Sequence, residues 1–274
     1  MNAPRTRIRP TTIAAVAIVV LLLASGLIAE FYTDLLWYED LGQAGVFWRT
    51  LGWEWAAGAA AAVLFFAILY VNLRIARSMV PATVFRLADT PAARFEEGLQ
   101  QLRERIGRVG GVVVLGVSAA AALVSGGAIA EKWQTIALAF NGGSFGATDP
   151  QFGRDLGFYF FSLPALRMAE QWLFGTLIFT LLATAVVHLL NGSIRPWDRW
   201  QGFDPHVKAH LSVLAGLIVV TQAFGYWLSI FELNYSPRGQ VIGASYTDVH
   251  AQIPAYTILI GIALLCGIAL IVNI

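Results

Sequence analysis

Six long stretches without any Asp, Glu, Lys or Arg constrain this chain more than any other feature. They cover residues 12–29, 56–73, 109–130, 171–194, 209–231 and 253–274. A helix needs about 20 mostly apolar residues to cross the hydrocarbon core of a bilayer, and a helix satisfies its own backbone hydrogen bonds in lipid. We therefore predict an all-α, polytopic transmembrane helix bundle of about six spans, forming one transmembrane domain over residues 1–274. The spans are expected near 12–30, 53–73, 109–130, 171–191, 209–231 and 253–273.

The composition excludes several other classes of protein. Charged residues make up 13% of the chain, about half of the roughly 25% that is usual in soluble domains. The net charge of +1 provides no field that would attract nucleic acid. The single Cys266 allows neither a disulfide framework nor a thiolate metal cluster. A disordered tail, a nucleic-acid-binding module and an ordinary cytosolic enzyme are therefore excluded, and the expected surroundings are the lipid bilayer.

The distribution of Lys and Arg predicts the orientation. The segments before the first window, after the second and after the fourth hold three, seven and three of these residues, whereas the other three connecting segments hold one, three and one. Because cytoplasmic loops carry the excess of Lys and Arg, we expect a cytoplasmic N-terminus. The first window is longer than a signal-peptide core, so we interpret it as an uncleaved signal anchor.

The predicted cytoplasmic loop after the second span contains a short amphipathic helix. Thr90 and Pro91 are typical of an N-cap and a first helical position, and apolar residues then recur at helical spacing up to Ile106. Such a helix lies on the membrane surface or packs between spans, and the sequence favours neither arrangement.

Two predicted outer loops are rich in turn-forming and polar residues. In the first loop, a short helix over 132–140 ends at Asn141-Gly142-Gly143, and a turn-rich, aromatic run follows. Together the two loops supply the candidate site residues: Asp149, Phe152, Arg154, Asp155, Arg238, Tyr246, Asp248 and His250. If they converged, the carboxylates and the imidazole would suit calcium binding or acid–base chemistry. We favour the simpler interpretation, in which they cap helices, form turns and pair between loops.

His206 and His210 are weak candidates for metal ligands. Their i, i+4 spacing places both imidazoles on one helix face, as in some zinc sites, and His188 could approach from the end of the preceding span. However, Val207 occupies the position at which a metalloprotease motif carries glutamate, and Asp204-Pro205 is typical of a helix start. We therefore expect no metal.

Small residues predict where helices pack closely. Ala122-x-x-x-Gly126 and Gly116-x-x-x-Ala120 lie in the third window and Ala263-x-x-x-Gly267 lies in the last. Such motifs let helix backbones approach each other in lipid. We expect the third span to be central in the bundle.

The chain resembles Uncharacterised Protein Family 0182, a family of large bacterial membrane proteins. The resemblance rests on three motifs: the Asp-Pro-x-Phe-Gly-x-Asp core within 145–164, the segment 235–249, and the opening segment 34–48. It implies that a further span and a large extracytoplasmic domain follow Ile274 in the full gene product, and it implies no reaction.

Several functions stay open at this point. We favour an anchor or scaffold in the bacterial plasma membrane, whose partner is an extracytoplasmic domain or an envelope protein. A transporter or channel subunit is the alternative, and a membrane enzyme using the outer Asp, His and Arg residues ranks below it. The sequence lacks a phosphate loop, a nucleophile elbow and a dinucleotide fingerprint, so we expect no cofactor and favour a non-enzymatic role. It predicts no oligomeric state.

Overall fold

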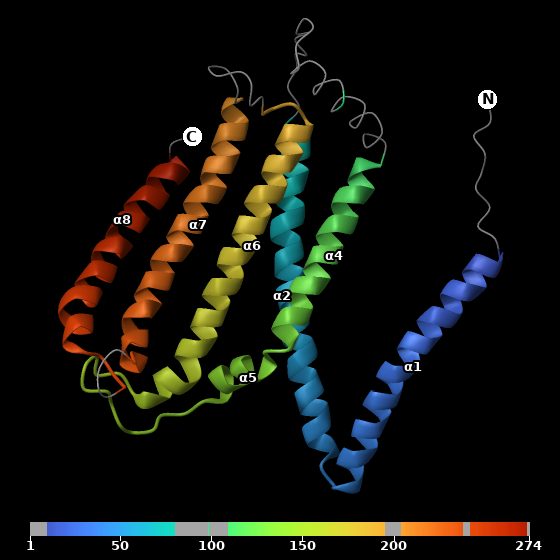
Figure 1. The fold of residues 1–274 in the computed structure, drawn as a ribbon, viewed down its shortest axis with the longest axis horizontal. Helices are drawn as coiled ribbons and strands as arrows, with labels where there is room; N and C mark the ends of the chain where they lie inside the picture. Colours follow the sequence, from blue (N-terminus) through green and yellow to red (C-terminus); the bar gives the residue numbers. More distant parts are fainter. Residues whose placement is uncertain (1–9, 80–97, 99–108, 195–203, 238–241, 273–274) are drawn as a thin grey trace, which may run out of the picture. The chain divides into compact units, whose positions relative to one another are not determined.

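The fold was obtained as a computed structural model, which describes residues 10–79, 98, 109–194, 204–237 and 242–272. Within these residues the chain is almost entirely helical (Figure 1). The longer helices are α1 (Pro10–Asp40), α2 (Ala44–Ser78), α4 (Gly110–Ala130), α6 (Leu163–Leu190), α7 (Pro205–Glu232) and α8 (Ile253–Val272). Shorter elements are α5 (Trp133–Asn141), the π-turns η1 (Phe158–Ser162) and η3 (Asp248–Gln252), and the 3₁₀ turn η2 (Leu233–Tyr235).

Five of the described helical segments are long and apolar enough to cross a membrane. They are Ala44–Ser78, Gly110–Ala130, Phe158–Leu190, Pro205–Tyr235 and Asp248–Val272. Each of them overlaps most of one of the last five charge-free windows, and α1 covers the first window. The all-α bundle predicted from the sequence is therefore confirmed.

The helices extend beyond the predicted spans in several places. The prediction began the fourth span only after Glu170 because it treated charged residues as loop residues, but α6 begins at Leu163 and carries Arg167 and Glu170 within the helix. Asp204 caps α7 as expected, accepting a hydrogen bond from the backbone N–H of His206 at 2.9 Å. The short helix expected over 132–140 is present as α5.

The chain divides into two compact units, residues 1–55 and 56–274. In the first unit, α1 turns into α2 through Gly42, whose φ of +66° is available to glycine at little cost. Aromatic rings close this helical hairpin, since the Phe47 ring contacts those of Phe31 and Tyr38 with centroids 5.4 and 5.7 Å away.

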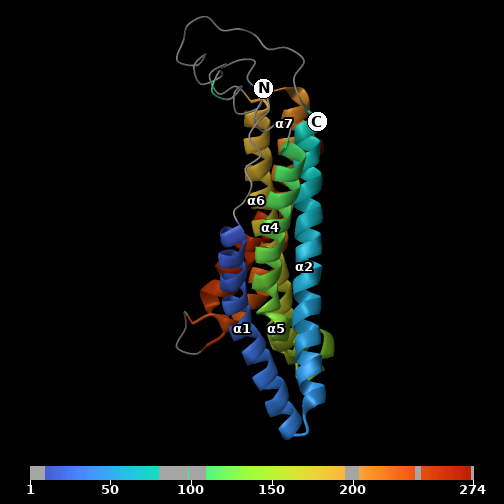
Figure 2. The ribbon, with the colours of Figure 1, turned by 90° about the vertical axis from the view of Figure 1, so that its right-hand side faces the viewer.

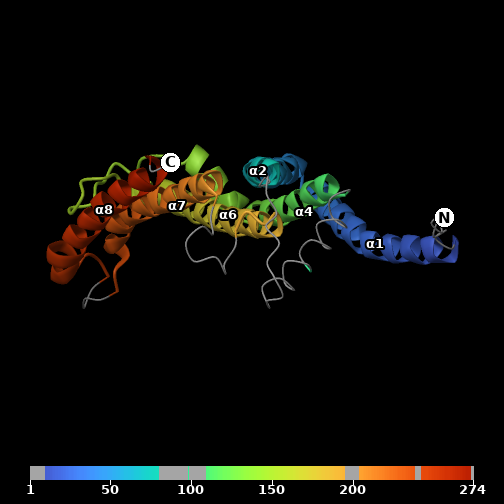
Figure 3. The ribbon, with the colours of Figure 1, turned by 90° about the horizontal axis from the view of Figure 1, so that it is seen from above.

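In the second unit the helices run along a common direction (Figure 2). Seen from above, α8, α7 and α6 follow one another in a row, and α2 lies to one side of α6 and α4 (Figure 3). Residues 131–162, 233–237 and 242–252 lie together at one end of this unit, which we call the loop end (Figure 1). The core between α2, α4 and α6 contains Phe65, Leu69, Leu73, Val114 and Ala122.

Two of the three small-residue motifs lie at close helix contacts. A Cβ at Gly126 would lie 2.7 Å from the carbonyl oxygen of Gly58 on α2, and a Cβ at Gly267 would lie 3.0 Å from that of Gly216 on α7. Such approaches bring backbones into van der Waals contact. At Gly116 a Cβ would meet nothing within 4 Å, so that motif makes no such contact among the described residues.

Several sequence predictions fall on residues that the structure does not describe. The amphipathic helix expected after Thr90, the basic residues of the N-terminal tail and Arg238 all lie outside the described ranges.

Candidate functional site

The loop end contains a tight turn built around the buried Asp149. Its side chain is 5% exposed. Oδ1 accepts hydrogen bonds from the backbone N–H groups of Gln151 and Phe152, at 2.9 and 2.7 Å. Oδ2 accepts from the Arg154 N–H at 3.0 Å and from the Tyr159 hydroxyl at 2.8 Å. The carboxylate therefore organises its own turn, and it also bonds to the Asn234 side chain after α7.

Asp155 organises the neighbouring part of the same loop. It accepts hydrogen bonds from the Ser144 hydroxyl and from the backbone N–H groups of Phe145, Gly146 and Gly157. Thr148 and Asp155 also form an isolated antiparallel bridge. Gly153, at φ +65°, lets the chain reverse between the two acidic residues.

These hydrogen bonds set the acidity of both carboxyl groups. Burial raises the pKa of Asp149, but hydrogen bonds from the Phe152 N–H, the Tyr159 hydroxyl and the Arg154 N–H outweigh burial and leave the pKa below its ordinary value of 3.8. The pKa of Asp155 is lowered too, chiefly by the Ser144 hydroxyl and then by the Phe145 and Gly157 N–H groups. Both groups are thus anions near neutral pH, and neither is poised to act as a general acid.

An aromatic cluster fastens this turn to α6 and α7. Tyr159, Leu163, Leu228 and Phe231 are buried together, and Phe152 packs against them. The Arg154 guanidinium lies over the Phe158 and Phe231 rings, 5.1 and 5.4 Å from their centroids, as in cation–π contacts. Phe152 and Arg154, named from the sequence, therefore hold the turn in place.

The second loop contains the other described candidates, which also bond locally. Asp248 is fully buried, and its Oδ2 accepts hydrogen bonds from the backbone N–H and the hydroxyl of Ser245, at 3.0 and 2.8 Å. The His250 ring stacks on that of Tyr246, with centroids 3.9 Å apart, and its Nδ1 lies 3.0 Å from the Tyr246 carbonyl oxygen. Asp248 and His250 therefore each bond to a residue three or four positions earlier in the same loop.

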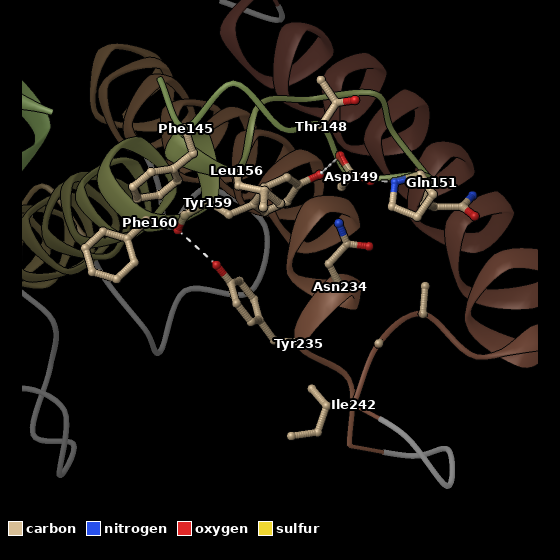
Figure 4. A pocket seen from close by; sticks show the side chains of 13 residues that line it. Phe145, Thr148, Asp149, Gln151, Leu156, Tyr159, Phe160, Asn234, Tyr235 and Ile242 are labelled. Atoms are coloured by element: carbon tan, nitrogen blue, oxygen red, sulfur yellow. Dashed lines mark hydrogen bonds between the residues drawn. The ribbon is translucent and has the colours of Figure 1, made fainter. Parts of the chain in front are cut away.

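The two loops meet along an open groove of about 740 Å³ (Figure 4). Phe145, Asp149, Gln151, Tyr159 and Phe160 come from the first loop and η1, and Asn234, Tyr235 and Ile242 come from the segment after α7. The Tyr235 hydroxyl donates to the Tyr159 carbonyl oxygen at 2.9 Å and so joins the two sides of the groove (Figure 4). The groove therefore offers aromatic walls and a few polar groups.

A charged cluster beside this groove was missed by the sequence analysis. Arg167 on α6 donates to both carboxylate oxygens of Glu232 at the end of α7, to the Ser229 hydroxyl at 2.8 Å, and to Glu170 at 3.3 Å. Glu170 is 6% exposed and packs against Gly225. The spacing Arg167-x-x-Glu170 on a helix was the available signal, because it places both side chains on one face.

The structure brings together two of the three histidines named from the sequence, His188 and His210. His210 contacts His188 rather than His206: His188 Nε2 lies 3.2 Å from His210 Nδ1, and His210 Nε2 lies 2.9 Å from Asn72 Oδ1. His206 is exposed. Within the described residues, no group of three or more His, Cys, Asp or Glu side chains is arranged to hold a metal ion.

The chain was also compared with known proteins. It is 34% identical to a UPF0182 protein of Mycobacterium marinum over 265 residues, covering 96% of this chain and 26% of that protein. It is 34% identical to a UPF0182 protein of Thermobifida fusca over 280 residues, covering 100% of this chain and 27% of that protein. The chain therefore spans about a quarter of the length of these curated relatives.

No solved structure matches the chain. Residues 11–274 match the family described as "Uncharacterised protein family (UPF0182)". With this match and the apolar helices described above, the chain is a membrane protein that belongs to the UPF0182 family.

Proposed function

We propose that this chain is a plasma-membrane anchor that holds a preformed outer surface for an extracytoplasmic domain or an envelope partner. The observation that carries the proposal is the way the loop-end carboxylates are used. Asp149 and Asp155 each accept hydrogen bonds from three backbone N–H groups, so these carboxylates hold the loop in its folded conformation. A surface that is ordered before binding loses less entropy when a partner docks.

The aromatic groove supports the same role. Phe145, Phe160, Tyr235 and Ile242 are more than half exposed along it, although large apolar side chains are usually covered in a soluble environment. The Arg167 cluster joins α6 to α7, and Tyr159 and Tyr235 line both the groove and the neighbouring depression that contains Arg167 and Glu232. The groove therefore lies next to two helices that are joined by an ion pair.

Site-specific photo-crosslinking in cells tests the proposal. A benzophenone amino acid at Gln151 or Tyr235, both in the groove, should crosslink to a protein segment, either of the full gene product or of a second envelope protein. The control position is Leu265 on α8, which is 73% exposed on an apolar helix and should crosslink to lipid. Crosslinks to lipid alone from the groove positions would contradict the anchor role.

Transport is the second role suggested by the sequence, and solute flux into liposomes with the full gene product tests it. If Asp155→Ala or Asp248→Ala abolished flux in a folded protein, these residues would belong to a transport or catalytic site, and the anchor role would be wrong.

A further inference from the structure

The depression beside the groove lies where three apolar stretches of the chain end. It has a volume of about 520 Å³, and its lining includes Lys132, Gln171 and Glu232. Lys132 lies two residues after the third charge-free window, the fourth window begins at Gln171, and Glu232 directly follows the fifth. Because charged side chains are costly in the hydrocarbon core, the depression lies at the headgroup level of a bilayer.

The elements that line the depression contribute charges of opposite sign. Arg167 on α6 pairs with both Glu170 and Glu232, so this group of one guanidinium and two carboxylates is negative overall. At the start of α5, the exposed Lys132 has no ion-pair partner in the described part of the chain. The depression therefore combines a free cation with an ion-paired group that is negative overall.

Other polar groups of the depression are also available to a ligand. The Thr135 hydroxyl and the Gln171 amide line it and make no side-chain hydrogen bond with another described residue. Thr135 follows Lys132 by three residues, so both lie on one side of the first turn of α5. The Glu232 side chain is 37% exposed, and each of its oxygens has a lone pair beyond the one that accepts from Arg167.

An apolar strip of α6 leads away from the depression. The exposed residues of this strip recur at intervals of three or four, which places them on one helix face: Gln171, Gly175, Phe179, Leu182 and Val186. The strip covers roughly 22 Å of helix, more than the roughly 15 Å of hydrocarbon in one leaflet. On α5, next to the depression, Leu138 and Phe140 are 46% and 77% exposed. An acyl chain thus has apolar surface to follow from the depression.

We infer that the depression binds the headgroup of a phospholipid that carries a primary ammonium, such as phosphatidylethanolamine. The lipid phosphate accepts hydrogen bonds from Lys132 and Thr135, the ammonium donates to Glu232, and an acyl chain lies along the α6 strip. The two charges of this headgroup complement the two charged parts of the lining. The inference does not rest on the partner role proposed for the groove.

The same chemistry disfavours other headgroups and free solutes. A phosphatidylglycerol headgroup has no cation for Glu232, and the quaternary ammonium of phosphatidylcholine has no N–H to donate to a carboxylate. A free zwitterion would match the charges but would make no use of the apolar strip. The position at the ends of three spans therefore favours a membrane lipid as the ligand.

Native mass spectrometry of the purified chain tests the inference. The probes are phosphatidylethanolamine, phosphatidylcholine and phosphatidylglycerol with the same acyl chains, added one at a time to the protein in detergent. A hydrogen bond with a charged group changes an affinity by roughly tenfold or more. The chain should therefore bind phosphatidylethanolamine about tenfold more tightly than either of the other lipids, and equal binding of all three would overturn the inference.

Lys132→Gln is the most informative variant, because removing an exposed and unpaired ammonium costs the fold little. It should weaken the binding of phosphatidylethanolamine roughly tenfold, and Thr135→Val should weaken it to a smaller extent. The matched control is Lys208→Gln, which removes an exposed ammonium at the opposite end of α7 and should leave binding unchanged. Unchanged binding in Lys132→Gln, or an equal loss in Lys208→Gln, would contradict the assignment of the phosphate.

Soluble glycerophosphoethanolamine distinguishes a lipid from a free zwitterion, because it has the same headgroup without acyl chains. At the same concentration it should leave the bound phosphatidylethanolamine in place. Complete displacement would show that the acyl chains add nothing, and the lipid assignment would be wrong. Because this experiment measures bound lipid and the crosslinking experiment measures a bound protein at the groove, each proposal can fail without the other.

Discussion

Replacing Asp149 with alanine should open the loop-end turn while leaving the helices intact. The donors that lose their acceptor include the N–H groups of Gln151, Phe152 and Arg154 and the Tyr159 hydroxyl. Gln151 and Arg154 are exposed, so water replaces the carboxylate for their N–H groups at little cost. The Phe152 N–H and the buried Tyr159 hydroxyl have no such replacement.

The magnitude follows from these two bonds. A hydrogen bond to a charged group contributes roughly 1.5–3 kcal/mol, so two of them give about 4 kcal/mol for Asp149→Ala. Since 1.4 kcal/mol is a factor of ten, local opening should become up to roughly a thousandfold more frequent. Asp149→Asn retains one carbonyl oxygen for the Gln151 and Phe152 N–H groups and should lose about half of this free energy.

Hydrogen–deuterium exchange of the purified protein in detergent is the appropriate assay. The informative amides are those of Gly153 and Leu156, which bond to the carbonyl oxygens of Asp149 and Ala147. Gln151→Ala is the matched control, because only the backbone N–H of Gln151 contributes to the turn. Exchange in Asp149→Ala equal to that of the unaltered chain would refute the claim that this carboxylate organises the loop.

Three further predictions concern packing, charge and acid. Gly126→Ala places a Cβ 2.7 Å from the Gly58 carbonyl oxygen and should lower the free energy of unfolding by about 1–3 kcal/mol, measured by thermal unfolding in detergent, whereas Gly127→Ala, which meets nothing within 4 Å, should not lower it. Arg167→Met leaves the buried Glu170 without its ion pair and should cost roughly 3–5 kcal/mol in the same assay, with Glu170→Gln restoring part of the loss. The pKa of Asp149 lies below its ordinary 3.8, so the carboxylate stabilises the loop fully above pH 3.8 and loses this effect as the pH falls through the lower folded-state pKa. Hydrogen exchange of the loop amides, corrected for intrinsic rates, should therefore rise in that acidic range. The rise should be smaller in Asp149→Asn.

Much of the fold could be predicted from the sequence because lipid imposes a simple rule. A charge in the hydrocarbon core is costly, so charge-free windows such as 109–130 correspond closely to α4 at Gly110–Ala130. The same rule misplaced the start of α6. The rule treats each charged residue on its own, whereas Arg167 forms ion pairs with Glu170 on α6 and with Glu232 on α7.

The candidate site was less accessible to sequence reasoning. The Asp149-Pro150 turn carries its own local signals, and its role as a turn was the favoured interpretation. The His188–His210 contact depends on the register between α6 and α7, which helical spacing within one helix cannot reveal. Helical spacing indicated that His206 and His210 share a face of α7, but it could not indicate that His210 contacts His188. The contact between His210 and Asn72 on α2 likewise depends on the register between two helices.

The membrane topology underlies both proposals, and cysteine labelling tests it most directly. Cys266 is the only cysteine, so Cys266→Ser gives a background in which Gln151→Cys and His206→Cys can be introduced one at a time at exposed positions. A membrane-impermeant maleimide should label the first variant in intact spheroplasts and the second only after permeabilisation. Labelling of His206→Cys from outside, with Gln151→Cys protected until permeabilisation, would contradict the orientation and with it the assignment of the groove to the outer face.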